Sequence, residues 1–167
     1  MFRDLFSEVV SIVNRWVPQK KYDKEPEYRD DLIEFLRREL NKPSYFSFGP
    51  PQRISVRREA SKGLCDIAVD RKIGIELKKD LSKKKQVDRL IGQIVDYKKD
   101  YEDILIVLVG NTNKEALELL KDKINDLKGN QMIFSFSREP RIKIIDKGST
   151  PRTKRKEKSP FGFDLGM

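Results

Sequence analysis

Residues 64–79, which read LCDIAVDRKIGIELKK, indicate two short apolar strands joined by a polar turn. Asp66 lies early in the first strand, and Glu76 and Lys78 lie near the end of the second. Side chains alternate between the two faces of a strand, so Glu76 and Lys78 share one face while Leu77 turns into the core. Charged groups on an otherwise apolar sheet are costly unless they bind something. The stretch therefore predicts a binding site on one face of a sheet.

The chemistry of these side chains favours a divalent cation as the bound group. Hard ions such as Mg²⁺ prefer the oxygens of carboxylates, carbonyl groups and water. Asp66 and Glu76 supply two carboxylates. Lys78 supplies a positive charge that can orient a phosphate or an attacking water, or deprotonate that water if its own pKa is lowered.

Composition limits the remaining chemistry. The chain has 167 residues, with 36 Lys and Arg against 27 Asp and Glu, a net charge of +9 and no histidine. This length fits one domain, and the charge suits either a polyanionic partner or a surface rich in ion pairs. Without histidine, a histidine general base, a serine–histidine nucleophile and a histidine-ligated zinc site are excluded. Carboxylates, lysine, tyrosine and a bound metal must supply any catalysis.

The single cysteine, Cys65, excludes an intrachain disulfide, and its place in an apolar strand is typical of a small buried thiol. No apolar run approaches the roughly 18 residues of a membrane span, and no secretory signal is evident. The sequence therefore predicts a cytoplasmic protein without a membrane partner.

Hydrophobic periodicity predicts the element order ααβββαβαββ. The helices are expected at residues 2–17, 27–40, 84–99 and 113–127, and the strands at 53–59, 64–69, 73–79, 103–110, 131–137 and 141–146. This order favours an α/β fold, a three-layer α/β/α sandwich around a mixed sheet. Residues 1–146 would form one domain, followed at 147–167 by a basic, flexible tail. That tail could grip phosphates, dock a partner protein or have no role.

Asp66, followed after nine residues by Glu76-x-Lys78, resembles the signature of the PD-(D/E)xK nucleases, the restriction-endonuclease-like superfamily. Cys65 stands before the aspartate, where the nominal signature has proline. The superfamily's αβββαβ core is contained in the predicted order of elements over residues 27–110. The resemblance therefore implies a restriction-endonuclease-like core.

The helix after this signature carries a second similarity. Gln93 and Tyr97 have the Q-x-x-x-Y spacing of the RecB- and Mrr-like branch, at the edge of the helix's buried stripe. An amide and a phenol there could orient a phosphate, a water or the lysine. Members of the superfamily commonly add a glutamate from the first core helix. Glu27 is the predicted residue, with Asp31 and Glu34 on the same broad face as alternatives.

The resemblance implies a Mg²⁺-dependent deoxyribonuclease, with Mn²⁺ able to substitute, that acts in DNA repair, recombination or restriction. The predicted catalytic residues are Asp66, Glu76, Lys78, Glu27, Gln93 and Tyr97, and the predicted metal ligands are Asp66, Glu76, Glu27 and the carbonyl of Leu77. Phosphate contacts are predicted for Arg57, Arg58, Lys79, Lys83, Lys84 and Lys85, although the two arginines could instead pair with Glu59. DNA is the predicted partner, and formation of a homodimer is left open.

Two other classes of function fit the same sequence. One is a DNA-binding or assembly module that keeps the nuclease fold without catalysis, and binding of metal would count against it. The other is a basic α/β interaction domain in which the motif arose by chance. Carboxylates of Asp66 and Glu76 that lie far apart would favour this last reading.

Overall fold

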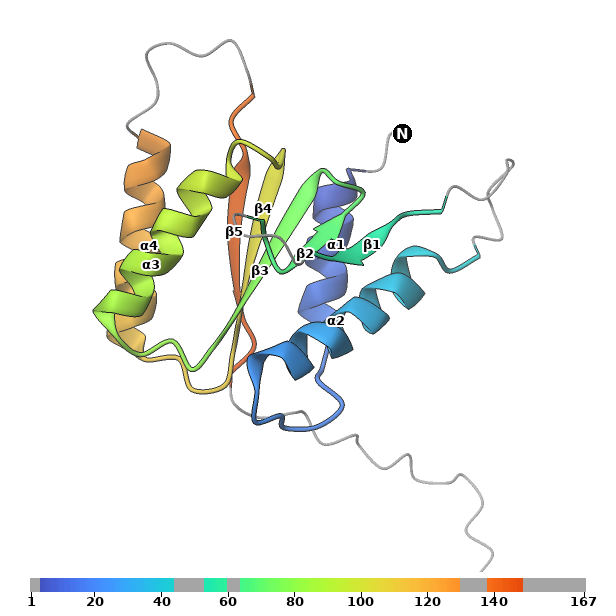
Figure 1. Ribbon diagram of the computed structural model, residues 1–167, viewed down its shortest axis with the longest axis horizontal. Coiled ribbons are helices and arrows are strands. Elements are labelled where there is room, and N and C mark those ends of the chain that lie inside the picture. The colour runs from blue at the N-terminus through green and yellow to red at the C-terminus, as the bar shows by residue number, and fades with distance from the viewer. Residues whose placement is uncertain (1–3, 44–52, 60–63, 130–137, 149–167) are drawn as a thin grey trace, which may run out of the picture.

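The computed structural model describes residues 4–43, 53–59, 64–129 and 138–148. These residues form four helices and a five-stranded mixed sheet, an α/β fold (Figure 1). The helices are α1 (Leu5–Arg15), α2 (Glu25–Leu40), α3 (Lys84–Tyr97) and α4 (Lys114–Gly129). The strands are β1 (Val56–Arg58), β2 (Ile67–Val69), β3 (Ile73–Lys79), β4 (Asp103–Val109) and β5 (Arg141–Asp146).

The sheet has the strand order β1-β2-β3-β4-β5, which is also the order of the strands along the chain. β1, β2 and β3 form an antiparallel meander, whereas β3, β4 and β5 are parallel and are connected through α3 and α4. Connections between parallel strands are normally right-handed. Because both connections move one strand further in the same direction across the sheet, their helices lie on the same face. α3 and α4 therefore share one layer.

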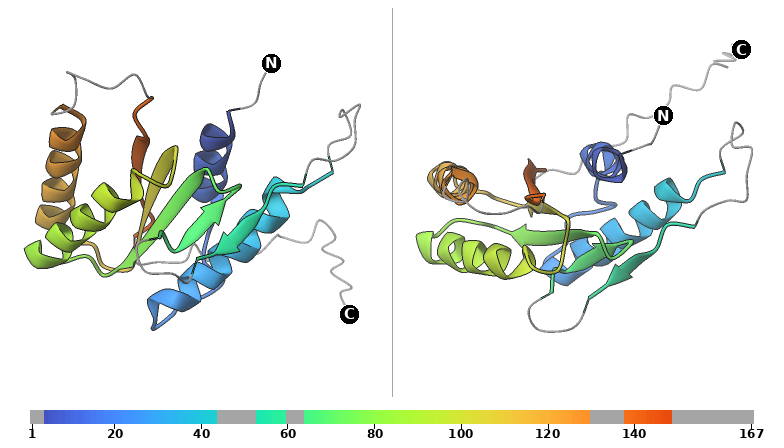
Figure 2. Two further views of the ribbon diagram at one scale, coloured as in Figure 1. Left: turned by 45° about the horizontal axis from the view of Figure 1, so that its top comes forward. Right: turned by 90° about the horizontal axis from the view of Figure 1, so that it is seen from above.

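The helices cover both faces of the sheet (Figure 2). On one face, α1 and α2 pack against side chains such as Leu77 and Leu105, and on the other face α3 and α4 pack against Ala68 and Ile106. The seven residues of β4 are all buried, because this strand contributes to both layers. Among the described residues, no helix combines the length and apolar character needed to cross a bilayer.

Most boundaries lie within a few residues of those expected from the sequence. β1 is shorter than predicted, and α2 begins at Glu25 rather than Glu27 because Pro26 fits within a first helical turn. Asn113 caps α4, because its side-chain oxygen accepts the amide protons of Glu115 at 2.8 Å and of Ala116 at 3.3 Å. The strand predicted at 131–137 and the tail beyond Gly148 lie outside the described residues.

Candidate functional site

A buried ion pair lies near the carboxyl end of β3. Glu76 is 2% exposed, and its Oε1 lies 2.6 Å from Nζ of Lys78. The hydroxyl of Tyr97, on α3, donates a hydrogen bond of 3.0 Å to Oε2 of the same carboxylate. Leu77 belongs to the core on the opposite face of the sheet, as the alternation of side chains predicts. The sequence therefore identified three side chains that meet at this point.

Asp66 lies immediately before β2, beside Glu76. Ile67 pairs with Ile75 in the antiparallel register, which places Asp66 opposite Glu76 on the neighbouring strand. Its Oδ2 accepts a hydrogen bond of 2.9 Å from the backbone N–H of Leu77. The two predicted carboxylates are therefore neighbours, so the separation that would have favoured a motif arising by chance is not found.

The two acids make this site electrostatically costly. Burial raises the pKa of the Glu76 carboxyl above its ordinary value, and the nearby charge of Asp66 raises it further. Lys78 and the hydroxyl of Tyr97 act in the opposite direction. The net effect is a raised pKa of Glu76, which the positive charge of Lys78 limits.

Lys78 supplies that charge. Burial alone would lower the pKa of its ammonium group, but attraction to Glu76, with smaller contributions from Glu25 and Asp66, raises the pKa above its ordinary value. The sequence left open whether Lys78 orients a water or deprotonates it. A raised pKa favours the first role, because a lysine acts as a base only when its pKa is lowered.

The acid that α2 contributes is Glu25, not the predicted Glu27. Oε1 of Glu25 lies 3.7 Å from Nζ of Lys78, and its Oε2 accepts a hydrogen bond of 2.8 Å from the backbone N–H of Lys79. Glu27 instead accepts a hydrogen bond of 3.1 Å from the backbone N–H of Lys24 at the start of the helix. The orientation of α2 above the end of β3 decides which acid reaches the site.

Neither of the alternative acids of α2 takes part. Oδ2 of Asp31 accepts hydrogen bonds from the backbone N–H of Gln19 at 2.8 Å and from the hydroxyl of Tyr22 at 3.0 Å, so it anchors the loop between α1 and α2. Glu34 is exposed on the outer surface of the helix. The one sequence signal for Glu25 was Pro26, because proline is favoured at the first helical position and therefore predicts an earlier helix start.

Gln93 and Tyr97 both lie on α3, one helical turn apart. Burial and the charge of Glu76 raise the pKa of the Tyr97 phenol far above its ordinary value, so this group remains a proton donor. Oε1 of Gln93 is buried without a hydrogen-bond partner among the described residues. An unsatisfied buried acceptor is rare in folded proteins and often marks a place where a ligand or water binds.

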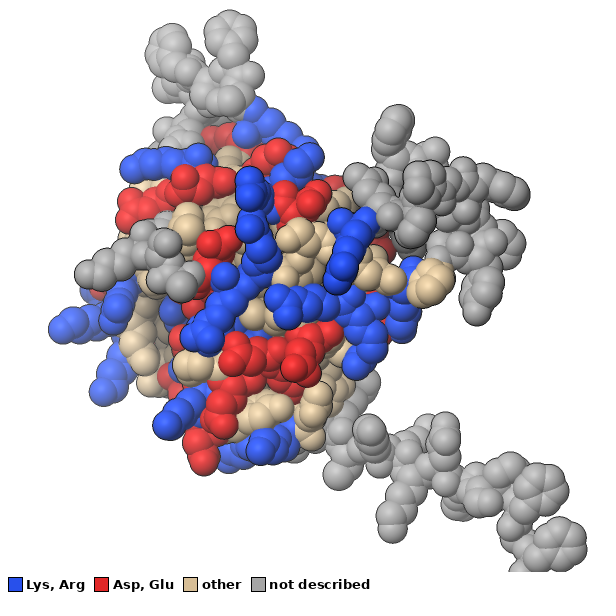
Figure 3. Space-filling model, turned by 45° about the vertical axis from the view of Figure 1, so that its right-hand side comes forward, with Lys and Arg blue, Asp and Glu red and all other residues tan. Residues whose placement is uncertain are grey.

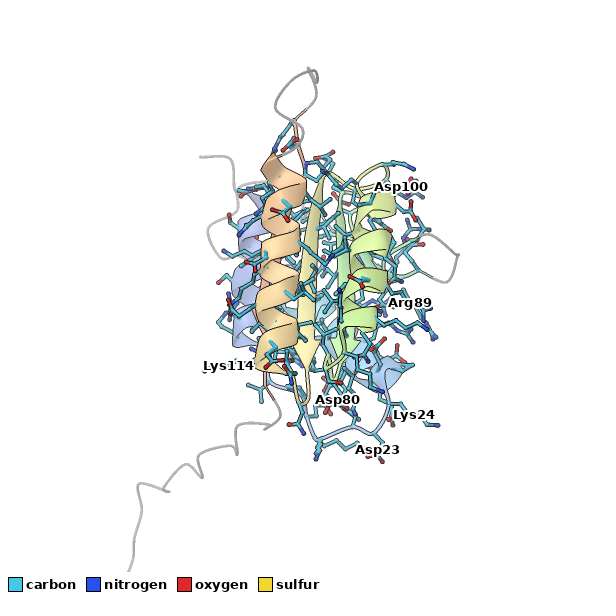
Figure 4. All side chains as sticks on the ribbon, turned by 90° about the vertical axis from the view of Figure 1, so that its left-hand side faces the viewer. Asp23, Lys24, Asp80, Arg89, Asp100 and Lys114 are labelled. Carbon is cyan, nitrogen blue, oxygen red and sulfur yellow. The ribbon has the colours of Figure 1, made fainter. Side chains whose placement is uncertain are left out.

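The predicted phosphate-binding residues fall into separate groups. Lys83, Lys84 and Lys85 are exposed at the start of α3, at the end of the molecule where Figure 4 shows Asp80 and Lys24. Lys79 forms an ion pair with Asp80, so its positive charge is partly neutralised within the protein. On the side where α2 and β1 lie, Figure 3 shows basic and acidic side chains interleaved. Among the described residues on that side, positive and negative charges therefore alternate rather than form one basic patch.

The side chains near Lys78 supply only part of what a metal ion requires. Among the described residues, no three Asp, Glu or Cys side chains lie close enough together to hold a metal ion. However, the Lys78 ammonium lies between carboxylate oxygens of Glu76 and Glu25, with Asp66 beside them, so these oxygens already accommodate a positive charge. All of these donors are oxygens, the type of ligand that Mg²⁺ prefers, but the three carboxylates would have to move closer together to share one ion.

Comparison of the chain with protein-family models, with curated proteins and with solved structures returned no match. The chemistry of the site is therefore inferred from its own side chains. These offer two adjacent carboxylates, a third from another element and a lysine ammonium between them. Such a group can bind a divalent cation and a phosphate next to each other.

Proposed function

We propose that the protein is a metal-dependent nuclease that hydrolyses DNA phosphodiester bonds and has a restriction-endonuclease-like core. The succession α2-β1-β2-β3-α3-β4 supports this proposal, because it has the αβββαβ order of that core. The single observation that carries the proposal is the meeting of Asp66, Glu76 and Lys78 at the end of β3. The sequence pattern that suggested a nuclease thus corresponds to one compact set of side chains.

In this proposal the acids bind the metal and the lysine acts on the phosphate. The residues that would hold Mg²⁺ are Asp66, Glu76, Glu25 and, through its carbonyl, Leu77. When bound, Mg²⁺ supplies positive charge and a water of lowered pKa. Lys78 is available as an ammonium group that orients the scissile phosphate and stabilises the negative charge that develops on it.

α3 has a positioning role in the same proposal. Tyr97 fixes the orientation of the Glu76 carboxylate through its hydrogen bond of 3.0 Å. Gln93, one helical turn before Tyr97, has a buried acceptor oxygen without a partner among the described residues, and this oxygen could bind a water or an amino group of the substrate. Neither residue needs to change its protonation state.

A cleavage assay tests the function. Single-stranded, duplex and branched DNA are incubated with Mg²⁺ or Mn²⁺, and Asp66→Asn, Glu76→Gln and Lys78→Met are each compared with the wild type. Each substitution is expected to reduce the cleavage rate by at least about a hundredfold. Asp70→Asn, in the turn at the other end of β3, is the matched control and should retain activity. Wild-type activity in Asp66→Asn or Glu76→Gln, or no cleavage by the wild type of any DNA in the panel, contradicts the proposal.

A DNA-binding module without catalysis is the second candidate. It is favoured by one observation, namely that the Lys78 ammonium already neutralises Glu76 at 2.6 Å, so the acids do not need a metal for stability. Calorimetric titration with Mg²⁺ separates the two candidates. Binding at millimolar concentration that is lost in Asp66→Asn supports the nuclease, and absence of binding by the wild type supports the module.

A further inference from the structure

Two arginines lie on either side of the acidic pair along the direction of β3. We propose that Arg57 and Arg89 bind phosphates of a single nucleic-acid strand, one on each side of the Asp66–Glu76 pair. This inference rests on the proposed nuclease function and extends it by giving the path of the substrate's backbone. Of the two adjacent arginines on β1, only Arg57 is assigned to phosphate binding, and Arg89 on α3 is added as the second phosphate-binding residue.

Arg89 lies on the side of α3 that borders the site. Gln93 and Tyr97 follow it at intervals of four residues, and residues at this interval are about 40° apart around a helix. The other side of α3 is fixed by Asp88, which lies 3.2 Å from Nζ of Lys123 on α4. Figure 4 shows Arg89 projecting from α3 on the side away from α4. Tyr97, Gln93 and Arg89 therefore form a row along α3 that begins at the site and ends at the guanidinium group of Arg89.

Arg57 lies on the same face of the sheet as Glu76, and Arg58 lies on the opposite face. Arg57 pairs in register with Ala68, which is buried in the layer of α3 and α4. Arg58 pairs with Ile67, which is buried in the layer of α1 and α2. Residues directly opposite each other on antiparallel strands point to the same face. Only Arg57 therefore shares a face with the acids.

The separation of the two arginines fits a short length of one strand. Arg57 is level with Gly74, two residues or about 7 Å before Glu76 on β3. Arg89 lies eight residues, or about 12 Å along the helix axis, from Tyr97, which contacts Glu76. Because α3 starts near the carboxyl end of β3, this second displacement has the opposite direction. The total is about 19 Å, the axial length of about six nucleotides in a B-form strand.

Both guanidinium groups are accessible to a ligand. Their side chains are exposed, and neither forms an ion pair with another residue that the structure describes, including Glu59 at the end of β1. Gln93, whose buried oxygen has no partner among the described residues, lies along α3 between Arg89 and Tyr97. Arginine is well suited to this role because its planar fork matches the geometry of a phosphate.

Fluorescence anisotropy with labelled single-stranded DNA in EDTA tests the inference without cleavage. Arg57→Gln and Arg89→Gln are each expected to weaken binding by about fivefold to tenfold at about 0.1 M salt and to reduce the slope of log affinity against log salt by about 0.7. Arg58→Gln is the matched control, since it removes the same charge one residue away, and it should bind as the wild type does. For the wild type, affinity should rise with oligonucleotide length up to about six nucleotides.

Two results would overturn the inference. The first is wild-type affinity in both Arg57→Gln and Arg89→Gln, and the second is an equal loss in Arg58→Gln, which would indicate a diffuse effect of net charge. Heparin is the control polyanion. If heparin binds as tightly as DNA and its binding depends on the same two arginines, a specific path for nucleic acid is excluded. A protein that binds DNA through Arg57 and Arg89 but hydrolyses none with Mg²⁺ would refute the nuclease proposal and leave the binding path intact.

Discussion

Gly74, the second residue of β3, allows the β2–β3 hairpin to pack against the segment that follows α3. A Cβ atom at this position would lie 2.5 Å from Sγ of Cys65 and 2.8 Å from the ring of Tyr101. Both of those side chains are buried, so neither can easily move away. The glycine therefore fixes how closely Tyr101 approaches the sheet directly beneath the candidate site.

Gly74→Ala is expected to lower the free energy of unfolding by about 1–3 kcal/mol, because the added methyl group overpacks the core. The measurement is urea denaturation. Gly92→Ala is the matched control, since Gly92 is exposed on α3 and its Cβ would contact nothing within 4 Å. That control should instead gain about 0.5–1 kcal/mol from helix propensity. Combining Gly74→Ala with Cys65→Ala should recover part of the loss, and no recovery would contradict this account of the clash.

Glu76 gives the protein a characteristic dependence on pH. Its pKa in the folded state is raised above 4.5, chiefly by burial, so the folded state binds a proton more tightly than the unfolded chain does. The free energy of unfolding therefore falls as the pH rises from about 4.5 through the raised pKa. Lys78 stays charged throughout this range, because its own pKa is raised above 10.5.

Glu76→Gln should remove this titration. Relative to the wild type, the variant should gain stability as the pH rises above 4.5, as measured by urea denaturation at several pH values. Glu118→Gln, an exposed acid on α4 that pairs with Lys121, is the control and should follow the wild-type profile. A parallel profile for Glu76→Gln would mean that Glu76 is not titrating abnormally.

At the scale of the elements, Arg141 joins three segments at the amino end of the parallel strands. Its guanidinium donates to both oxygens of buried Asp103 on β4, at 2.8 and 2.7 Å, and to both oxygens of Asp4 before α1, at 2.6 and 2.9 Å. The group also lies 4.6 Å from the ring centroid of Phe6. β5, β4 and α1 are therefore held together by one side chain.

Arg141→Gln should destabilise the protein by about 2–3 kcal/mol, because Asp103 would remain buried without its main countercharge. The expected cost is below that of a fully buried pair, because the Arg141 side chain is 37% exposed and Arg138 lies 3.7 Å from Asp103. Arg141→Lys keeps the positive charge but loses the planar guanidinium group that binds two carboxylates at once. Its free energy of unfolding, measured by urea denaturation, should lie between those of the wild type and Arg141→Gln. Equal stability of Arg141→Gln and the wild type would show that this contact contributes nothing.

Local sequence patterns predicted most of the helices and strands, but they could not predict how these elements are oriented relative to one another. The apolar run of β4 and the alternation in β3 predicted the buried strand and the shared face of Glu76 and Lys78 correctly. Glu25 was missed because the acid that reaches the end of β3 depends on how α2 crosses the sheet. The opposite faces of Arg57 and Arg58 follow from strand alternation, but only the register with β2 shows which face belongs to the acids.

For the whole molecule, the important feature is that two cores share one sheet. Trp16 is fully buried in the core beneath α1 and α2, and Cys65 is fully buried in the core beneath α3 and α4. They are the only tryptophan and the only cysteine in the chain. β2, β4 and β5 contribute side chains to both cores, so neither core can lose its packing without disturbing the other.

We therefore expect one cooperative unfolding transition. Fluorescence of Trp16 and reactivity of the Cys65 thiol, each followed through a urea titration, should give the same midpoint. The thiol should be inert in the folded protein, because burial raises its pKa far above the ordinary value. Two separate midpoints would show that the layers unfold independently.

The coincidence of strand order with chain order also has a consequence for the folding pathway. None of the five strands that the structure describes has to be inserted between two strands that are already paired, so each can add to the free edge left by the one before it. The β2–β3 hairpin has the most local pairing and should form early, whereas the parallel pairs must wait for their crossover helices. Substitutions in the hairpin should therefore slow folding, and those in β5 should mainly speed unfolding. Lys78 and Glu76 both lie on this hairpin, so the positive charge that neutralises Glu76 is already in place when the hairpin forms. The pair is therefore complete before α3 packs over it.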